Sequence, residues 1–322
     1  MRFDVSDAAK IQIVMVNWNA GAQLSEAVAS IARYHHNLVS SVIIVDNNSS
    51  DDSLVQVETI PNLPFNLKII RNTENRGFGA ACNQGAALAE SEFLLFLNPD
   101  TLLFSNSLTV PTAFMQKPEN VDVGVVGIQL LDENKHVARS CARFPSVGMF
   151  VAHAFGLNRI AGLRHLNMHM EDWAHNTTAT VNHVIGAFYL MRRAVFGSLG
   201  GFDERFFVYL EDLDLSLRVY QAGYRGIFLA DAQAYHAGGG TSEQVKAHRL
   251  FYSLRSRLLY GFKHFKLWQV CLLLVVSLLL EPFSRMLYAL VKGTSGDVRN
   301  TLNAYRMLYC NLPGTLKKAL WS

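Results

Sequence analysis

The chain is poor in cysteine, and its cysteines are not spaced for metal or disulfide chemistry. Only four of the 322 residues are cysteine, and no two of them form a CxxC pair. Small secreted domains depend on dense disulfides, and structural zinc sites use closely paired Cys or His ligands. The scattered positions therefore exclude a disulfide framework and a zinc ribbon, and they fit a reducing compartment. The four residues are Cys82, Cys141, Cys271 and Cys310.

The chain also lacks the glycine-rich patterns that bind phosphate in many nucleotide-binding proteins. Its first strand-to-helix turn, Asn17 to Gly21, contains neither GxGxxG nor a Walker loop.

The N-terminal residues lack a basic stretch followed by an apolar stretch, which is the pattern of a secretory signal. The expected location is therefore the cytoplasm.

Basic residues are scarce in the first three quarters of the chain and abundant in the last. Residues 245–322 hold twelve Lys or Arg and two acids, a net charge of +10, whereas residues 1–244 carry −7. A basic tail favours an anionic partner, either nucleic acid or lipid headgroups. The run from Leu267 to Leu280 is uncharged and apolar on all sides, which favours a membrane surface and argues against nucleic acid.

This apolar run is short for a membrane crossing. Fourteen residues of helix extend about 21 Å, whereas the hydrocarbon core is about 30 Å thick. We therefore predict a helix, or two helices kinked at Pro282, lying in the cytoplasmic leaflet with Lys263, Lys266, Arg285 and Lys292 at headgroup level. The alternative is a buried helix that packs on the rest of the chain or on a second copy.

Short apolar runs alternate with helical patterns in the first half of the chain. Strands are predicted at residues 11–16, 42–45, 67–70, 93–97 and 123–127, and helices at 22–34 and 77–90. This alternation predicts an α/β fold, with a mostly parallel sheet and helices on both faces. An irregular segment is expected at 144–180, a strand within 181–192, and helices after residue 241.

Polar blocks follow directly after three of the predicted strands. They are Asn17 to Asn19, Asp46 to Asp51 and Asn98 to Asp100. Ligands of open parallel sheets bind outside the C-terminal ends of the strands. We therefore expect these blocks to share one cleft.

An acidic cluster opens a predicted amphipathic helix. Glu211, Asp212 and Asp214 follow an aromatic segment directly. Acids at a helix start are favoured by the helix dipole, which accounts for part of the pattern, and Asp214 can pair with Arg218 one turn later. Like charges this close also raise one another's pKa, which is how a general base is made. From spacing alone, a solvated acidic turn and a general base remain equally open.

Five blocks, taken in order, resemble the inverting glycosyltransferases of family 2. They lie at residues 45–51, 74–85, 96–101, 200–218 and 235–240, and the resemblance extends from about residue 11 to 241. It is strongest to the rhamnosyltransferase-like branch that builds bacterial O-antigen and other surface polysaccharides. Each block is only moderately specific, but their order is distinctive. The resemblance implies a GT-A fold with a Rossmann-like nucleotide-binding sheet.

The resemblance implies a nucleotide-sugar site at Asn17, Asp46, Arg76, Gly77 and Asn83. Asp46 would accept the imide N–H of uracil or thymine, although a turn-capping role is the alternative. The glycine opens a helix whose N-terminal N–H groups favour an anion. For the asparagine at position 83, the alternative is an amide on a helix surface.

The resemblance also implies a metal site. Asn98-Pro99-Asp100 stands where the family has its DxD motif, with Asn in place of the first Asp. Asp100, with His236, would hold Mg2+ or Mn2+ against the diphosphate of the donor. Because the first Asp is replaced, we expect the metal to arrive with the nucleotide. An ordinary β-turn at residues 98–101 and a structural histidine are the alternatives.

Catalysis is implied at the acidic cluster. Asp212 would take the proton of the acceptor hydroxyl, and Glu211 would orient the acceptor or tune its neighbour. Gly186 and Ala187 match the segment that floors the acceptor cleft, although a strand glycine at a close backbone approach is the alternative.

The expected organisation is a catalytic domain at residues 1–241 and a basic helical region at 242–322 for membrane association or oligomerisation. The expected reaction is inverting transfer of a sugar, L-rhamnose first, from a dTDP- or UDP-linked donor to a lipid-linked saccharide at the inner face of the membrane. Two alternatives are weaker. A sugar nucleotidyltransferase would carry a basic loop, but residues 17–24 hold no Lys or Arg. A silent nucleotide-sugar-binding scaffold would tend to lose its acids, yet all are present.

Overall fold

The structure is a computed structural model, and it describes residues 11–238, 246–292 and 295–320. The boundary predicted between residues 241 and 242 lies outside these residues. The glycines at 239 and 240, which end the last of the five blocks, lie outside them too.

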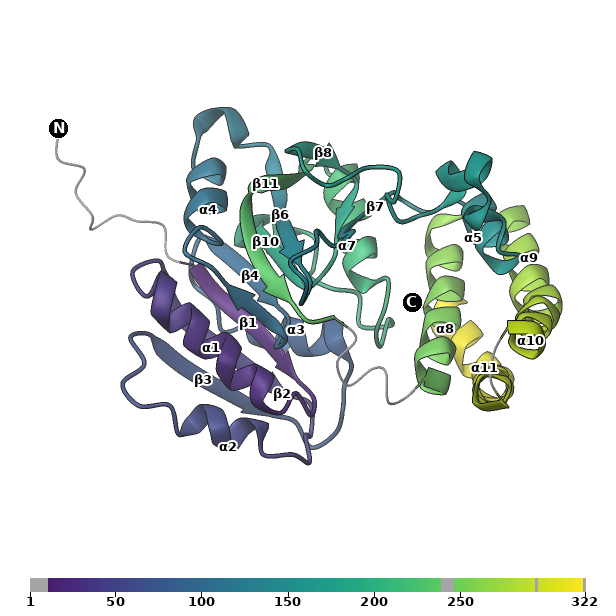
Figure 1. Cartoon of the computed structure of the whole chain (residues 1–322), viewed down its shortest axis with the longest axis horizontal. Coiled ribbons are helices and arrows are strands. Elements are labelled where there is room, and N and C mark those ends of the chain that lie inside the picture. The colour runs from purple at the N-terminus through teal and green to yellow at the C-terminus, as the bar shows by residue number, and fades with distance from the viewer. Residues whose placement is uncertain (1–10, 239–245, 293–294, 321–322) are drawn as a thin grey trace.

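A nine-stranded mixed sheet forms the centre of the described chain (Figure 1). The strand order is β3-β2-β1-β4-β10-β6-β11-β5, and β8 pairs with β11. The first four strands are parallel, as predicted, whereas β10 lies antiparallel between β4 and β6. The strands are β1 (Ile11–Asn17), β2 (Val39–Asp46), β3 (Asn66–Arg71), β4 (Phe93–Leu97), β5 (Thr101–Leu103), β6 (Val123–Leu131), β8 (Ala179–Val181), β10 (Phe188–Arg192) and β11 (Arg225–His236). Two short strands, β7 (Cys141–Ala142) and β9 (His183–Val184), pair separately.

Helices cover both faces of the sheet, as predicted. One face packs against α1 (Ala22–His35), α2 (Ser53–Glu58) and α4 (Thr109–Met115). The other packs against α3 (Phe78–Ala86), α6 (Arg193–Ser198) and α7 (Glu211–Gln221). Strands buried on both faces read as continuous apolar runs, which explains why β1 and β4 have no polar alternation.

A third core lies beside the sheet. It joins α5 (Val147–Ala154), α8 (Lys246–His264), α9 (Leu267–Val275) and α11 (Ser295–Leu320), and these helices gather to one side of the sheet in Figure 1. Phe206 and Leu213 belong to the same core, so it packs directly on the start of α7. The expectation that residues 144–180 are irregular was wrong for α5, which Ser146 caps by accepting the N–H of Met149. The described residues also form the 3-10 turns η2 (Pro118–Asn120), η3 (Leu157–Arg159) and η4 (Ala161–Leu166).

The C-terminal apolar helix is longer than the run read from the sequence. α9 continues through a π-helical segment (Val276–Leu280) into α10 (Glu281–Lys292). Pro282 lies in the first turn of α10. The irregularity that we expected at this proline is the π-helical segment just before it. The helix from Leu267 to Val291, 25 residues, is long and apolar enough to cross a membrane by length and composition, and 28% of its apolar window is buried in the protein.

Candidate active site

A cleft of about 720 Å³ opens where the parallel strands end. Asn47 follows β2, Asn98 and Asp100 follow β4, and His236 ends β11; all four line it. The cleft expected from the polar blocks is therefore present. The start of α3, with Gly77, and the first turn of α8 close its sides.

Asp100 and His236 face each other in this cleft. The end of β11 pairs antiparallel with β5, which brings His236 beside the residue that follows Asp100. Ala237 also donates its N–H to the backbone oxygen of Asp100. Oδ1 of Asp100 lies 3.4 Å from Nε2 of His236, and both side chains are largely buried. The same Oδ1 is buried without a hydrogen-bond partner among the described residues. A buried carboxylate oxygen with no donor is a suitable ligand for a hard cation.

The backbone conformation at position 77 requires glycine. Its φ of 87° and ψ of 170° lie in a region open almost only to glycine. Phe207 accepts the N–H of Phe78 at 2.8 Å, and a Cβ at position 77 would lie only 2.3 Å from the same carbonyl oxygen. The absence of a side chain therefore lets the aromatic segment before α7 lie directly against the start of α3.

Asn17 and Asp46 lie side by side at the ends of β1 and β2. The Nδ2 of Asn17 donates to Oδ1 of Asp46 at 2.7 Å, and the backbone N–H of Ser49 donates to Oδ2 at 3.1 Å. Both residues are buried, behind the cleft residue Asn47. A contact between Asp46 and a nucleotide base stays a prediction; each oxygen of the carboxylate accepts one of these bonds and keeps a second lone pair.

Arg76 and Asn83 lie outside the set of residues that line the cleft. Arg76 is half-exposed and reaches Glu204 at 3.8 Å. Asn83 binds both backbone groups of Phe202, donating to its oxygen and accepting its N–H, each at 2.9 Å. The amide thereby fixes the loop that leads to α7, and its nucleotide role stays a prediction.

A second cavity, of about 420 Å³, contains the acidic cluster. Asp212 and Glu211 line it, together with residues of α5 and α8. Tyr209 and Arg249 line both this cavity and the first cleft. The two cavities therefore adjoin, with this pair between them. We call the first the donor cleft and the second the acceptor cavity, after the roles that the resemblance implies.

Backbone groups fix the carboxylate of Asp212 in the acceptor cavity. Oδ1 accepts the N–H of Leu213 at 2.8 Å, and Oδ2 accepts the N–H of Gly186 at 2.9 Å. Tyr209 and Leu210, just before α7, both have positive φ (69° and 66°), which is unusual for residues with a side chain. This turn begins α7 abruptly and points its first residues into the cavity. Ala187, next to Gly186, accepts the N–H of Asn98 at 3.1 Å, so one short segment links the two sites.

Glu211 and Asp212 differ in their surroundings. The Glu211 side chain is 5% exposed, and its Oε2 has no hydrogen-bond partner among the described residues. Burial raises the pKa of Glu211 well above its usual value, and the charge of Asp212 raises it further. Its surroundings therefore favour the protonated form of Glu211, whereas two backbone N–H groups hold the carboxylate of Asp212 in the cavity.

Asp214 has a structural environment. Arg218, Lys263 and His264 each contact its fully buried carboxylate within 2.8 Å, which confirms the pair expected with Arg218. Burial alone would raise the pKa of Asp214, but the hydrogen bond from His264 and the two neighbouring cations bring it below its usual value. These contacts bind the end of α8 to α7.

The sequence missed the residues that complete both cavities. Trp18, Tyr209, Arg249 and Tyr252 line the donor cleft, and His169 and His183 line the acceptor cavity. Trp18 and Tyr209 stand inside blocks that the sequence marked but were not singled out there, and no motif or spacing marks the other four. The only signal was the basic character of the chain after residue 245, which was interpreted as lipid-facing.

Comparisons with known proteins show the family and the fold. Residues 12–200 match the family model described as Glycosyl transferase family 2. An N-acetylglucosaminyl-diphospho-decaprenol L-rhamnosyltransferase of Mycobacterium tuberculosis is 25% identical over 272 residues, covering 80% of this chain and 86% of that protein. The O-antigen chain rhamnosyltransferase WbaN of Salmonella anatum is 27% identical, covering 72% and 67%. The fold is similar to that of the mannosyltransferase PcManGT from Pyrobaculum calidifontis in complex with GDP-Man and Mn2+, with a TM-score of 0.54, 18% identity, and coverage of 99% of this chain and 89% of that one.

Proposed function

Because the chain belongs to glycosyl transferase family 2, and is therefore a glycosyltransferase, we propose that it transfers L-rhamnose from a dTDP- or UDP-linked donor to a lipid-linked saccharide, with inversion at C1. The observation that carries this proposal is the pair of adjoining cavities. One contains Asp100 and His236, and the other contains Asp212. The mycobacterial relative, whose name specifies L-rhamnose and a diphospho-decaprenol carrier, supports the choice of sugar and acceptor.

Asp100 and His236 would hold a divalent cation, Mg2+ or Mn2+, in the donor cleft. The unpartnered Oδ1 of Asp100 fits this role, and so does the imidazole 3.4 Å away. Among the described residues, no group of three or more His, Cys, Asp or Glu could hold a metal, so the donor's phosphate oxygens would complete the ligand set. When bound, the cation neutralises charge on the departing diphosphate. The structural relative in complex with Mn2+ supports this assignment.

The nucleotide would lie along the ends of β1 and β2 and the start of α3. Asp46 would accept the base N–H, with Asn17 holding its carboxylate. Gly77, which lines the cleft at the start of α3, would lie beside the diphosphate, and Arg76 would pair with the anion from the surface. Asn83 would act by fixing the loop to which it is bound.

Asp212 would act as the base for the acceptor hydroxyl. As the acceptor oxygen attacks C1, its proton passes to Asp212, the O–C1 bond forms, and the bond from C1 to the diphosphate oxygen breaks. Attack on the face opposite the diphosphate inverts the configuration at C1. Protonated Glu211 beside it would orient the acceptor, and the backbone at Gly186 and Ala187 would form the floor on which it rests.

The apolar face of α9 and α10 would lie in the cytoplasmic leaflet and bring the enzyme to a lipid-linked acceptor. Leu267, Phe283, Leu287 and Val291 are each at least 65% exposed. The opposite side of the helix is fixed to protein, because buried Glu281 pairs with Arg257 of α8 at 2.5 Å. A helix anchored in this way fits in-plane binding better than a crossing.

The direct test is a transfer assay with dTDP-rhamnose and UDP-sugars, using membrane lipid extract as acceptor. We expect metal-dependent formation of labelled lipid from dTDP-rhamnose, and we expect Asp212→Asn to abolish it while nucleotide binding, measured by calorimetry, persists. Proton–carbon coupling at C1 of the product reports inversion. Native-rate transfer by Asp212→Asn would remove this residue as the base, and a failure to bind any nucleotide would contradict the whole proposal.

A further inference from the structure

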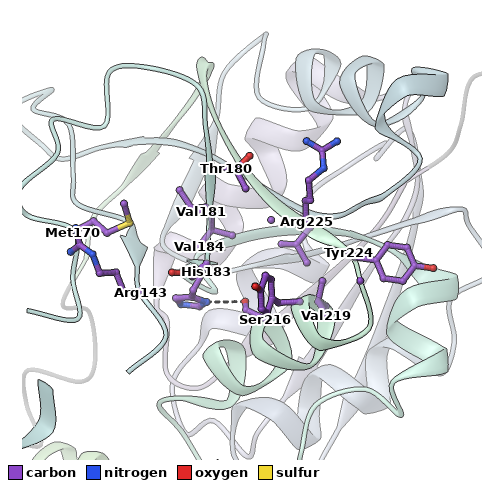
Figure 2. Close-up of a pocket in the computed structure, with 15 residues that line it drawn as sticks. Arg143, Met170, Thr180, Val181, His183, Val184, Ser216, Val219, Tyr224 and Arg225 are labelled. Carbon is purple, nitrogen blue, oxygen red and sulfur yellow. Dashed lines mark hydrogen bonds between the residues drawn. The ribbon is translucent and has the colours of Figure 1, made fainter. Parts of the chain in front are cut away.

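A chain of buried polar side chains leads from the protein interior to Asp212. The hydroxyl of Tyr189 lies 2.9 Å from Oγ of Ser216, which lies 3.0 Å from Nδ1 of His183. On the other side of the ring, Nε2 lies 3.6 Å from Oδ2 of Asp212. Figure 2 shows the contact between His183 and Ser216, which both line a further cavity of about 500 Å³.

The protons of this chain can be assigned. Burial lowers the pKa of His183, so its ring is neutral and carries one N–H, and burial raises the pKa of Tyr189, so its phenol remains protonated. A lone pair on Nε2 would face the anionic oxygen of Asp212 and be repelled. The N–H therefore lies on Nε2, and Nδ1 accepts the hydroxyl proton of Ser216, which in turn accepts that of Tyr189. Each proton is used once, and all point toward the base.

We infer that His183 is a positioning residue for Asp212, which Ser216 and Tyr189 hold with its Nε2–H directed at the carboxylate. The inference rests on the proposed function, because it assumes that Asp212 is the base. At 3.6 Å the contact is longer than a hydrogen bond, as catalytic contacts often are before substrate binds. The N–H orients Oδ2 and favours the ionised carboxylate, the form that can accept the acceptor's proton.

The other ionisable groups around Asp212 do not supply such a donor. Glu211 and Asp214 flank it on α7; the surroundings of the first favour its protonated form, and the second is paired away. Burial lowers the pKa of His169, which interacts with Asp212 through its charge only. Cys82 and Tyr189 are fully buried, and burial raises the pKa of each, so neither adds charge near neutral pH. Arg249 and Arg257 of α8 line the same cavity, but Arg257 pairs with Glu281, and neither lies within ion-pair distance of Asp212. Among the described side chains, His183 is therefore the one whose polar hydrogen faces this carboxylate.

The test compares His183→Leu with His183→Gln in the transfer assay across a pH series. Leucine removes the N–H, so we expect kcat/KM to fall about tenfold to a hundredfold near pH 7. The carboxylate then takes up a proton more readily, so the acid limb of the pH–rate profile moves to higher pH. The amide of glutamine restores an N–H at a similar reach, and we expect it to return the acid limb toward its wild-type position. Calorimetric nucleotide binding should be equal in both variants.

Ser216→Ala provides a second route if the leucine variant fails to fold. It keeps the ring and removes the proton donor to Nδ1, so we expect a smaller shift of the acid limb in the same direction. A uniform loss of activity with an unmoved acid limb, in either variant, would show a purely structural role and overturn the inference. Asp212→Asn in the same assay separates the two claims: if it is active, the proposed base is wrong, whatever the histidine does.

Discussion

The backbone N–H of Gly186 donates a 2.9 Å hydrogen bond to Oδ2 of Asp212, across 26 residues of sequence. A Cβ at position 186 would lie 3.3 Å from the same oxygen and would displace it. We expect Gly186→Ala to lower kcat about tenfold to a hundredfold, because small misplacements of a reacting group are costly. Nucleotide affinity should not change. The control is Gly197→Ala, where a Cβ meets nothing within 4 Å; equal activity of the two variants would contradict the prediction.

The metal site is testable through nucleotide binding. We expect Mn2+ to increase the affinity of the wild-type protein for dTDP or UDP, and Asp100→Asn or His236→Gln to remove most of that gain, because each variant loses a ligand. Affinity without metal should be preserved. Asp231→Asn changes an exposed acid on the strand that carries His236 and is the matched control. Undiminished Mn2+ dependence in the Asp100 variant would place the metal elsewhere.

The close approach at Gly77 should appear in stability. Gly77→Ala places a Cβ only 2.3 Å from the backbone oxygen of Phe207, at a residue whose positive φ is unfavourable for alanine. Gly223→Ala places a Cβ in open space at a residue with a similar φ of 88°. We expect the Gly223 variant to lose about 1–2 kcal/mol of unfolding free energy and the Gly77 variant more than about 3 kcal/mol. Denaturant unfolding measures both, and similar losses would mean that the clash relaxes.

Asp214 should contribute a pH-dependent share of stability. Its folded-state pKa lies below the unfolded value, so its stabilising contribution is complete above the unfolded pKa and is lost as pH falls through the folded one. We expect Asp214→Asn to be less stable than the wild type at pH 7 by about 3–5 kcal/mol, because two cations lose their buried partner, and the difference to shrink below about pH 4. A difference independent of pH would exclude ion pairing as its source. Asp122→Asn, which breaks a surface pair with Arg225, should have a smaller effect.

Membrane binding should depend on the exposed face of α10. Phe283→Asp and Leu287→Asp replace side chains that are 76% and 65% exposed. Each apolar side chain contributes about 2 kcal/mol on burial, so we expect each variant to sediment at least tenfold less with vesicles containing phosphatidylglycerol. Val121→Asp, equally exposed but remote from α10, is the control. If the variants instead dissociate a dimer in ultracentrifugation and still bind vesicles, the face is an interface between copies.

The sequence predicts the fold well where periodicity reports burial. The runs at β1, β2 and β4 have both faces covered, so their continuous apolar residues mark them clearly. The direction of β10 was not predictable, because Phe188 to Met191 are buried on both sides and apolar runs carry no direction. α5 was missed because its eight residues are almost uniformly apolar, without a helical period, and the cap at Ser146 was the remaining signal.

Some residues of the candidate site can also be recognised from the sequence, and others cannot. Asp100 and Asp212 could be singled out because each stands in a block that resembles a family motif, next to a recognisable strand end or helix start; their roles stay predictions. Tyr209, His183 and Arg249 have no such local signal, since their places depend on contacts between segments far apart in the sequence. Asn83 stands in a recognised block, but its amide is occupied by Phe202, a contact 119 residues away that no local pattern reports.

Helix α8 couples the two cavities to one another. Its first turn lines the donor cleft, its middle lines the acceptor cavity with Ser253 and Arg257, and its end binds Asp214. All of it lies beyond residue 200, where the family match ends. A displacement of this single helix would therefore change the walls of both cavities and the support of α7 together, so neither cavity can be reshaped through α8 without affecting the other.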